Sequence, residues 1–122
     1  MTFPTIIYKY NGIYSGEQLA TLTDQKLVTL EKFINDGVMA TCEVEFEKVT
    51  AQQHGQIYRV EANLTLDGTL YRAEAVEESF EKAIDEVRNE LDKELRRAKD
   101  KQTSLLKRTG RKIKEQLLGW RK

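Results

Sequence analysis

Few residues that commonly carry out catalysis occur in this sequence, and their spacing does not bring them together. The only cysteine, Cys42, occupies an alternating apolar position of an expected strand, which predicts a small buried residue rather than a reactive thiol. The only histidine, His54, lies in a polar loop, and one His with one distant Cys is not a metal site. Glu43, Glu45 and Glu47 alternate on one strand face, as solvated sheet residues do. We therefore expect no catalytic residues, no metal and no cofactor.

The basic residues are a stronger signal, because they are unevenly distributed along the chain. The 122 residues include 20 basic and 20 acidic side chains, so the formal net charge is zero. Residues 1–95 contain 9 Lys and Arg against 18 Asp and Glu, whereas residues 96–122 contain 11 against 2. An acidic body with a strongly basic end favours a polyanionic partner for that end, and nucleic acid is the commonest one.

A long helix, predicted from about Ser79 onward, must position most of these cations. Its apolar residues recur every three or four positions and make one continuous helical stripe: Phe80, Ala83, Ile84, Val87, Leu91, Leu95 and Ala98. Basic residues are interspersed with acids on the opposite side. A stripe this regular predicts packing on a flat apolar surface.

Strands before the helix supply that surface. Three segments alternate apolar and polar residues, as strands with one buried face do: 41–49, 57–67 and 69–75. Asp67-Gly68 separates the last two segments and predicts a two-residue hairpin, since a type I′ turn needs positive φ at both central positions.

The first part of the chain predicts a strand over residues 3–10 and a helix over about 16–34. Ser15 and Gln18 have the spacing of a capping box at the helix start, and Thr23 is a rival start. The element order is then β-α-β-β-β-α, which predicts an α+β fold with a four-stranded sheet and both helices on one face. The crossover through the first helix predicts that the first two strands are parallel neighbours.

The C-terminal residues form a separate basic segment. Gln102-Thr103-Ser104 interrupts the apolar stripe, and we divide the chain into a domain over residues 1–101 and a basic tail over 102–122. Gly110 and the short periodicity predict a marginal helix in the tail that orders on a partner. Trp120 suits either stacking on a base or docking on the body.

The hydropathy of the chain indicates its location. No apolar run approaches the roughly 20 residues that a membrane span needs, and the N-terminus lacks the pattern of a signal peptide. We therefore expect a cytoplasmic protein.

Five short segments stand out by their order and spacing: Lys26–Phe33, Tyr58–Leu64, Arg72–Ala75, Ala83–Asp85 and Leu95–Lys101. Each is a weak motif alone. Together with the β-α-β-β-β-α order, they resemble the ribosome hibernation-promoting factor family, also called ribosome-associated inhibitors. The resemblance covers roughly residues 5–101, most of the chain.

The resemblance implies a cytoplasmic, non-enzymatic protein that binds the small ribosomal subunit or the 70S ribosome. It implies contact with 16S rRNA at the decoding centre, where the protein blocks mRNA and tRNA binding and inhibits translation in idle ribosomes. The implied fold is similar to a double-stranded-RNA-binding domain. Long members of the family carry a separate C-terminal dimerisation domain, for which the residues after Lys101 leave no room, so the chain resembles a short form.

The resemblance also implies the residues that contact rRNA phosphates: Lys26 and Lys32 on the first helix, and Arg88, Lys93, Arg96, Arg97, Lys99 and Lys101 on the second. The charge pattern adds five tail residues as RNA-binding candidates: Lys107, Arg108, Arg111, Lys112 and Lys114. Thr29 and Glu90 stand where related sequences commonly carry Lys. For Lys32, an ion pair with Asp36 one turn later is an alternative.

Two other functions are compatible with the same pattern. One is a generic module that binds structured RNA through the same fold. The other is an adaptor whose long helix pairs with the helix of a partner protein, a function that exposed apolar residues from Leu105 onward would favour.

Overall fold

The computed structural model describes residues 3–13, 16–51 and 54–119, with side chains in these ranges described as far as Lys107. The element order is β-α-β-β-β-α, with the first helix continued by a short 3₁₀ segment, which confirms the predicted order. The elements are β1 Ile6–Asn11, α1 Glu17–Leu27, η1 Val28–Phe33, β2 Ala40–Lys48, β3 Tyr58–Leu66, β4 Thr69–Glu77 and α2 Phe80–Gly119.

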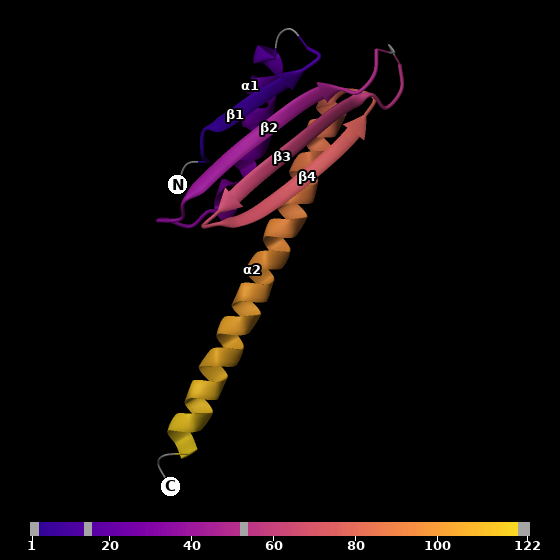
Figure 1. Cartoon of the computed structure of the whole chain (residues 1–122). Helices are drawn as coiled ribbons and strands as arrows, with labels where there is room; N and C mark the ends of the chain where they lie inside the picture. The colour runs from indigo at the N-terminus through magenta and orange to yellow at the C-terminus, as the bar shows by residue number, and fades with distance from the viewer. Residues whose placement is uncertain (1–2, 14–15, 52–53, 120–122) are drawn as a thin grey trace.

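The four strands form one sheet in the order β1-β2-β3-β4. β1 and β2 are parallel, with Ile6 opposite Cys42, because the chain crosses over through α1 and η1 between them. The other neighbours are antiparallel, as hairpin-connected strands must be. Both helices lie behind one face of the sheet in Figure 1. The predicted α+β architecture and the parallel pair are therefore confirmed.

The core lies between the helices and this face of the sheet. Alternate strand residues point inward, and the α2 stripe packs on them, because both periodicities place their apolar residues toward the same layer. Cys42 is 1% exposed, and burial raises the pKa of its thiol to about 12, which confirms the small buried residue predicted there. The core includes Leu27, Leu30, Val44, Phe46, Val60, Ala62, Leu64, Ala83, Ile84, Val87, Leu91 and Leu95.

The predicted hairpin turn is confirmed. Asp67 and Gly68 both have positive φ, +47° and +84°, as a type I′ turn requires. Asp67 also ties the turn to the preceding loop, since its Oδ1 accepts the Met39 N–H at 2.8 Å and its own N–H donates to the Met39 carbonyl at 2.8 Å. These two hydrogen bonds fix the β3–β4 turn to the loop that precedes β2.

The first helix differs from the single helix predicted over 16–34. The α-helical part ends at Leu27, and residues 28–33 form a 3₁₀ turn. The change coincides with Thr29, whose hydroxyl donates to the Lys26 carbonyl at 2.7 Å, a local bond that competes with α-helical geometry. Thr23 is not the helix start, because it lies inside α1. Ser15, the expected capping residue, lies outside the described residues.

The helix predicted after residue 101 is present, and it is continuous with the core helix, since α2 runs without interruption for 40 residues to Gly119. At 1.5 Å per residue it is about 60 Å long, and its second half projects beyond the sheet in Figure 1. The Thr103 hydroxyl bonds to the Lys99 carbonyl at 3.0 Å inside the helix, so the polar triplet does not end it. The stripe does end there, since Leu106 is 70% exposed.

Trp120 lies outside the described residues, so both of its predicted roles remain predictions. In the part of the chain that the structure describes, no helix is both long enough and apolar enough to cross a membrane.

Candidate nucleic-acid interface

The outer surface of the helical layer carries the residues predicted to bind RNA. α1 and η1 lie beside the first half of α2, and polar side chains join the two along a seam. At one end of the seam, Lys26 Nζ lies 2.8 Å from Asp85 Oδ1, and this hydrogen bond raises the pKa of the lysine. The charge of Lys26 is therefore matched inside the protein.

Arg88 and Arg96 are held on the same seam by a shared carboxylate. Arg88 Nε donates to Thr29 Oγ1 at 2.9 Å, and Arg88 Nη1 lies 3.3 Å from Asp92 Oδ2. Arg96 Nε donates to the other oxygen, Asp92 Oδ1, at 3.0 Å. The Asp92 side chain is 18% exposed, so it holds both guanidinium groups close to the body.

Phe33 contacts Arg96 and one further cation, Lys32. The Arg96 guanidinium lies 5.3 Å from the ring centroid, and the Lys32 ammonium lies 5.4 Å from it. Both distances are within the range of cation–π attraction. Among the described residues, Lys32 forms no ion pair with Asp36, so the alternative of a pair one turn later is wrong. Phe33 thus holds Lys32, which has no carboxylate partner in the described part of the chain, and also Arg96, which Asp92 already pairs.

A second group of cations on α2 makes no internal contact. Lys93, Arg97 and Lys101 follow one another at four-residue spacing on one side of the helix, about 6 Å apart along its axis. Their side chains and that of Lys99 are exposed, and within the described ranges none of the four forms an ion pair or a side-chain hydrogen bond. These cations are available to an external anion.

The tail candidates continue along the same helix. Lys107 is exposed. The side chains of Arg108, Arg111, Lys112 and Lys114 lie outside the described residues, although the helical backbone of α2 carries all four positions. The helix that leaves the sheet therefore carries a basic sequence along its whole projecting half.

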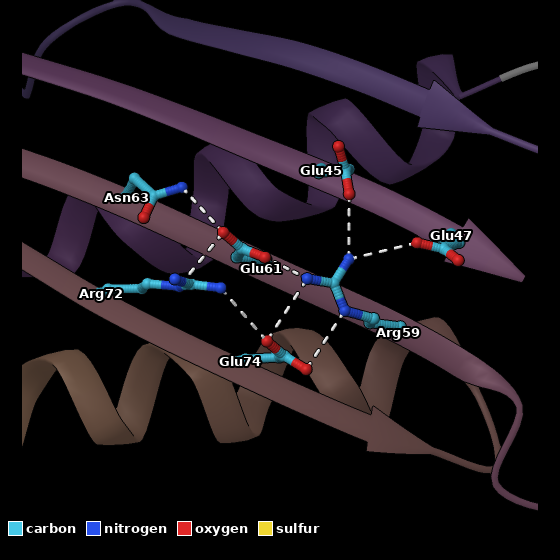
Figure 2. A network of polar contacts seen from close by, with 7 residues as sticks. All are labelled: Glu45, Glu47, Arg59, Glu61, Asn63, Arg72 and Glu74. Atoms are coloured by element: carbon cyan, nitrogen blue, oxygen red, sulfur yellow. Dashed lines mark hydrogen bonds and ion pairs between the residues drawn. The ribbon is translucent and has the colours of Figure 1, made fainter. Parts of the chain in front are cut away.

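The other face of the sheet carries an acidic network that the sequence interpretation missed (Figure 2). The Arg59 side chain is 16% exposed and contacts Glu45 at 2.9 Å, Glu47 at 3.3 Å and Glu74 at 3.2 Å, and it also contacts Glu61. Hydrogen bonds to these carboxylates, with Glu74 first, raise the pKa of Arg59. Two of the three glutamates in the predicted solvated ladder, Glu45 and Glu47, therefore contact one arginine.

A second arginine and an amide complete this network. Arg72 Nε lies 3.2 Å from Glu61, and Asn63 donates to the same carboxylate at 3.1 Å. Burial acts to raise the pKa of Glu61, but the Asn63 hydrogen bond and the two arginines outweigh it and lower that pKa. The four network glutamates outnumber the two arginines, so this face repels an RNA backbone and leaves the helical side as the candidate interface.

The strand alternation could have located Arg59 on the polar face, but the network depends on the register. Glu47 lies opposite Arg59, and Glu45 and Glu74 both lie opposite Glu61. Among the described residues, no group of three or more His, Cys, Asp or Glu side chains is placed to hold a metal ion.

Comparisons with known proteins agree with this fold. The N-terminal domain of Thermus thermophilus Protein Y superimposes with a TM-score of 0.62 at 18% identity, covering 76% of this chain and 97% of that one. A ribosomal subunit interface protein from Coxiella burnetii superimposes with a TM-score of 0.58 at 23% identity, covering 78% and 97%. A comparison with curated protein sequences finds no significant match.

A family model supplies the assignment. The model described as Sigma 54 modulation protein / S30EA ribosomal protein matches residues 6–103, from β1 to the point where α2 has left the sheet. This range includes the seam between α1 and α2, the two cations that contact Phe33, and the exposed cations of α2 up to Lys101. The chain therefore belongs to the Sigma 54 modulation protein / S30EA ribosomal protein family, a family of ribosome-associated proteins.

Proposed function

We propose that this protein is a cytoplasmic, non-enzymatic ribosome hibernation factor. It binds 16S rRNA of the small ribosomal subunit at the decoding centre and blocks the binding of mRNA and tRNA. Membership of a ribosome-associated family supports a ribosomal partner. The observation that carries the proposal is the line of exposed, unpaired cations Lys93, Arg97 and Lys101 on α2, beside a body whose open sheet face is acidic.

The mechanism is steric and electrostatic. Lys and Arg side chains that neutralise phosphates release counterions, which favours binding without requiring base recognition. The exposed cations of α2 contact rRNA, and the volume of the sheet and helices then occupies the path of mRNA and tRNA. Lys26 and Arg88 contribute less, because Asp85 and Asp92 already neutralise them. Arg96 also shares Asp92, so of the two cations at Phe33 it is Lys32 that adds charge at the edge of the same surface.

The test is co-sedimentation with purified ribosomal subunits in sucrose gradients at low and high salt. A variant with Lys93, Arg97 and Lys101 changed to Ala loses three phosphate contacts. Its binding constant should fall, and the slope of log binding constant against log salt should become shallower by about 2–3 units, at 0.7–0.9 per lost contact.

A matched control changes three basic residues that do not lie on α2, Lys9, Lys48 and Arg72, to Ala. It alters the net charge equally and should bind nearly as the unaltered protein does. Equal loss in both variants would show that only net charge matters and would contradict the site. Competition by tRNA supports the decoding centre, whereas retained affinity for duplex RNA without ribosome binding would indicate the generic RNA-binding module.

A second candidate function is supported by one observation. Leu105 and Leu106 are 50% and 70% exposed on the projecting half of α2, as the adaptor alternative expects. Such residues suit contact with an apolar surface of a partner protein. A dimer or complex that persists at high salt and is lost in the Leu106→Asp variant would favour this function over RNA binding.

A further inference from the structure

A hollow of about 240 Å³ lies at the end of the sheet from which α2 projects. Its walls come from three parts of the chain, namely the end of η1 with the loop after it, the β3–β4 hairpin, and α2 between Leu95 and Gln102. Leu95 is the last buried residue of α2 among those that the structure describes. The hollow therefore sits where the packed part of α2 meets its exposed cations.

The floor of the hollow is apolar and aromatic. Phe33 and Tyr71 line it and are half-buried, and Leu95 also lines it and is 3% exposed. The Tyr71 hydroxyl has no hydrogen-bond partner within the described ranges, whereas the Tyr8 hydroxyl has two and the Tyr10 hydroxyl has one. Tyr71 therefore presents both a ring and an unused polar group to a ligand.

The rim of the hollow is charged and polar. Lys32 and Lys99 both line it, both are exposed, and in the described part of the chain neither is paired with a carboxylate. Asp67 also lines it, with Oδ1 accepting the Met39 N–H and Oδ2 left for another donor. The Gln102 side-chain amide adds a donor and an acceptor. One side of a ligand thus meets positive charge and another meets hydrogen-bonding groups.

A planar ring with polar edges and one phosphate fits this combination. Nucleobases stack on aromatic side chains, and lysines bind phosphate oxygens. The volume is below the roughly 300–1,000 Å³ of pockets for drug-sized ligands, so it suits one ring system rather than a large cofactor. We propose that this hollow binds an unstacked nucleobase, with the attached phosphate held by Lys32 and Lys99.

The inference deepens the proposed function and rests on it for the source of the base, an unpaired nucleotide of rRNA. A free nucleotide offers the same chemistry, so the two sources have to be distinguished. Base insertion would anchor α2 at one position on the RNA, which phosphate contacts alone do not do.

The first test needs no ribosome. The protein is titrated with each of the four nucleoside 5′-monophosphates, and separately with inorganic phosphate, while backbone amide signals are followed by NMR. We expect saturable shifts at Phe33 and Tyr71 with at least one nucleotide and not with phosphate at the same concentration. Equal shifts with phosphate, or no shifts with any nucleotide, would overturn the proposal.

The second test uses a variant whose side chain fills the hollow. Ala98 is half-buried in its wall, so Ala98→Leu occupies the space without changing charge or helical preference much. Nucleotide affinity should fall at least tenfold. Thr103→Leu, an exposed position one turn further along α2 that does not line the hollow, is the control and should retain it. Unchanged nucleotide affinity in Ala98→Leu contradicts the proposal.

Ribosome binding by the same two variants identifies the source. Weaker 30S binding by Ala98→Leu, with loss of the chemical protection of one 16S nucleotide, assigns the hollow to rRNA. Unchanged 30S binding together with lost nucleotide shifts assigns it to a free nucleotide. Failure of the unaltered protein to bind ribosomes at all would overturn the proposed function instead, so the two failures are separate results.

Discussion

At the scale of single residues, Asp92 and Phe33 decide which cations remain available for RNA. Asp92 accepts from Arg88 and Arg96 through its two oxygens, while Phe33 holds Lys32 by its charge without neutralising it. A carboxylate cancels a positive charge, whereas an aromatic ring positions it. The candidate interface therefore depends on the residues that contact the cations inside the protein as much as on the cations themselves.

Arg59 is the residue on which the open sheet face depends. In Arg59→Met, four glutamates lose their common partner while the aliphatic volume is retained. Because the side chain is largely buried but the glutamates are partly exposed, we expect unfolding free energy to fall by about 1–3 kcal/mol in urea denaturation.

Arg72 is the matched control for this change. Its side chain is 56% exposed and contacts two glutamates of the same network, at 3.2 and 3.6 Å, where Arg59 contacts four. Arg72→Met should lower the unfolding free energy by less than about 1 kcal/mol, as exposed ion pairs do. Equal losses in the two variants would mean that Arg59 is not the centre of the network.

At the scale of elements, α2 has two structural roles along one continuous helix. Its first half is part of the core, with Leu91 0% exposed, and its second half projects from the body, with Leu106 70% exposed. The helical backbone continues past the end of the sheet, so the packed half sets the direction in which the basic half extends (Figure 1).

A leucine-to-alanine change should lower the unfolding free energy strongly in the first half of α2 and hardly at all in the second half. Leu91→Ala removes a fully buried side chain and should lower the unfolding free energy by about 2–5 kcal/mol. Leu106→Ala removes an exposed side chain from the same helix and should change it by no more than about 0.5 kcal/mol. Thermal or urea denaturation checks both, and a large loss in Leu106→Ala would show that the projecting half packs on the body.

At the scale of the whole molecule, opposite charges are separated along the chain. The 9 basic and 18 acidic residues of positions 1–95 form an acidic body, whereas α2 carries most of the 11 basic residues that follow. The long-range field therefore orients the protein toward a polyanion with the helix end first.

Removing residues 104–122 tests this separation and the division of the chain into body and tail. The shortened chain keeps the core and the hollow, so its unfolding free energy should stay within about 1 kcal/mol of the full chain. Its ribosome binding should weaken and depend less on salt, because tail cations are lost. Salt-dependent sedimentation measures this, and unchanged binding would assign all contacts to residues before 104.

The sequence by itself determined the order of the elements, the buried face of each strand, the hairpin at Asp67-Gly68 and the core stripe of α2. These features are encoded by residues close together in the chain, through periods of two and 3.6 residues and through backbone preferences at single positions. The family resemblance also rests on such local segments. The end of α1 was the local feature predicted wrongly, at Thr29.

Only the tertiary structure decided which cations are free and where a ligand can enter. Lys26 forms an ion pair with Asp85, and Arg88 donates a hydrogen bond to Thr29. In each pair the two residues are 59 positions apart in the sequence. The Arg59 network needs the register of three strands, and the hollow needs three separate segments to meet. Charge, burial and shape at these places come from contacts between distant residues, and local periodicity carries no information about which distant side chains will face each other.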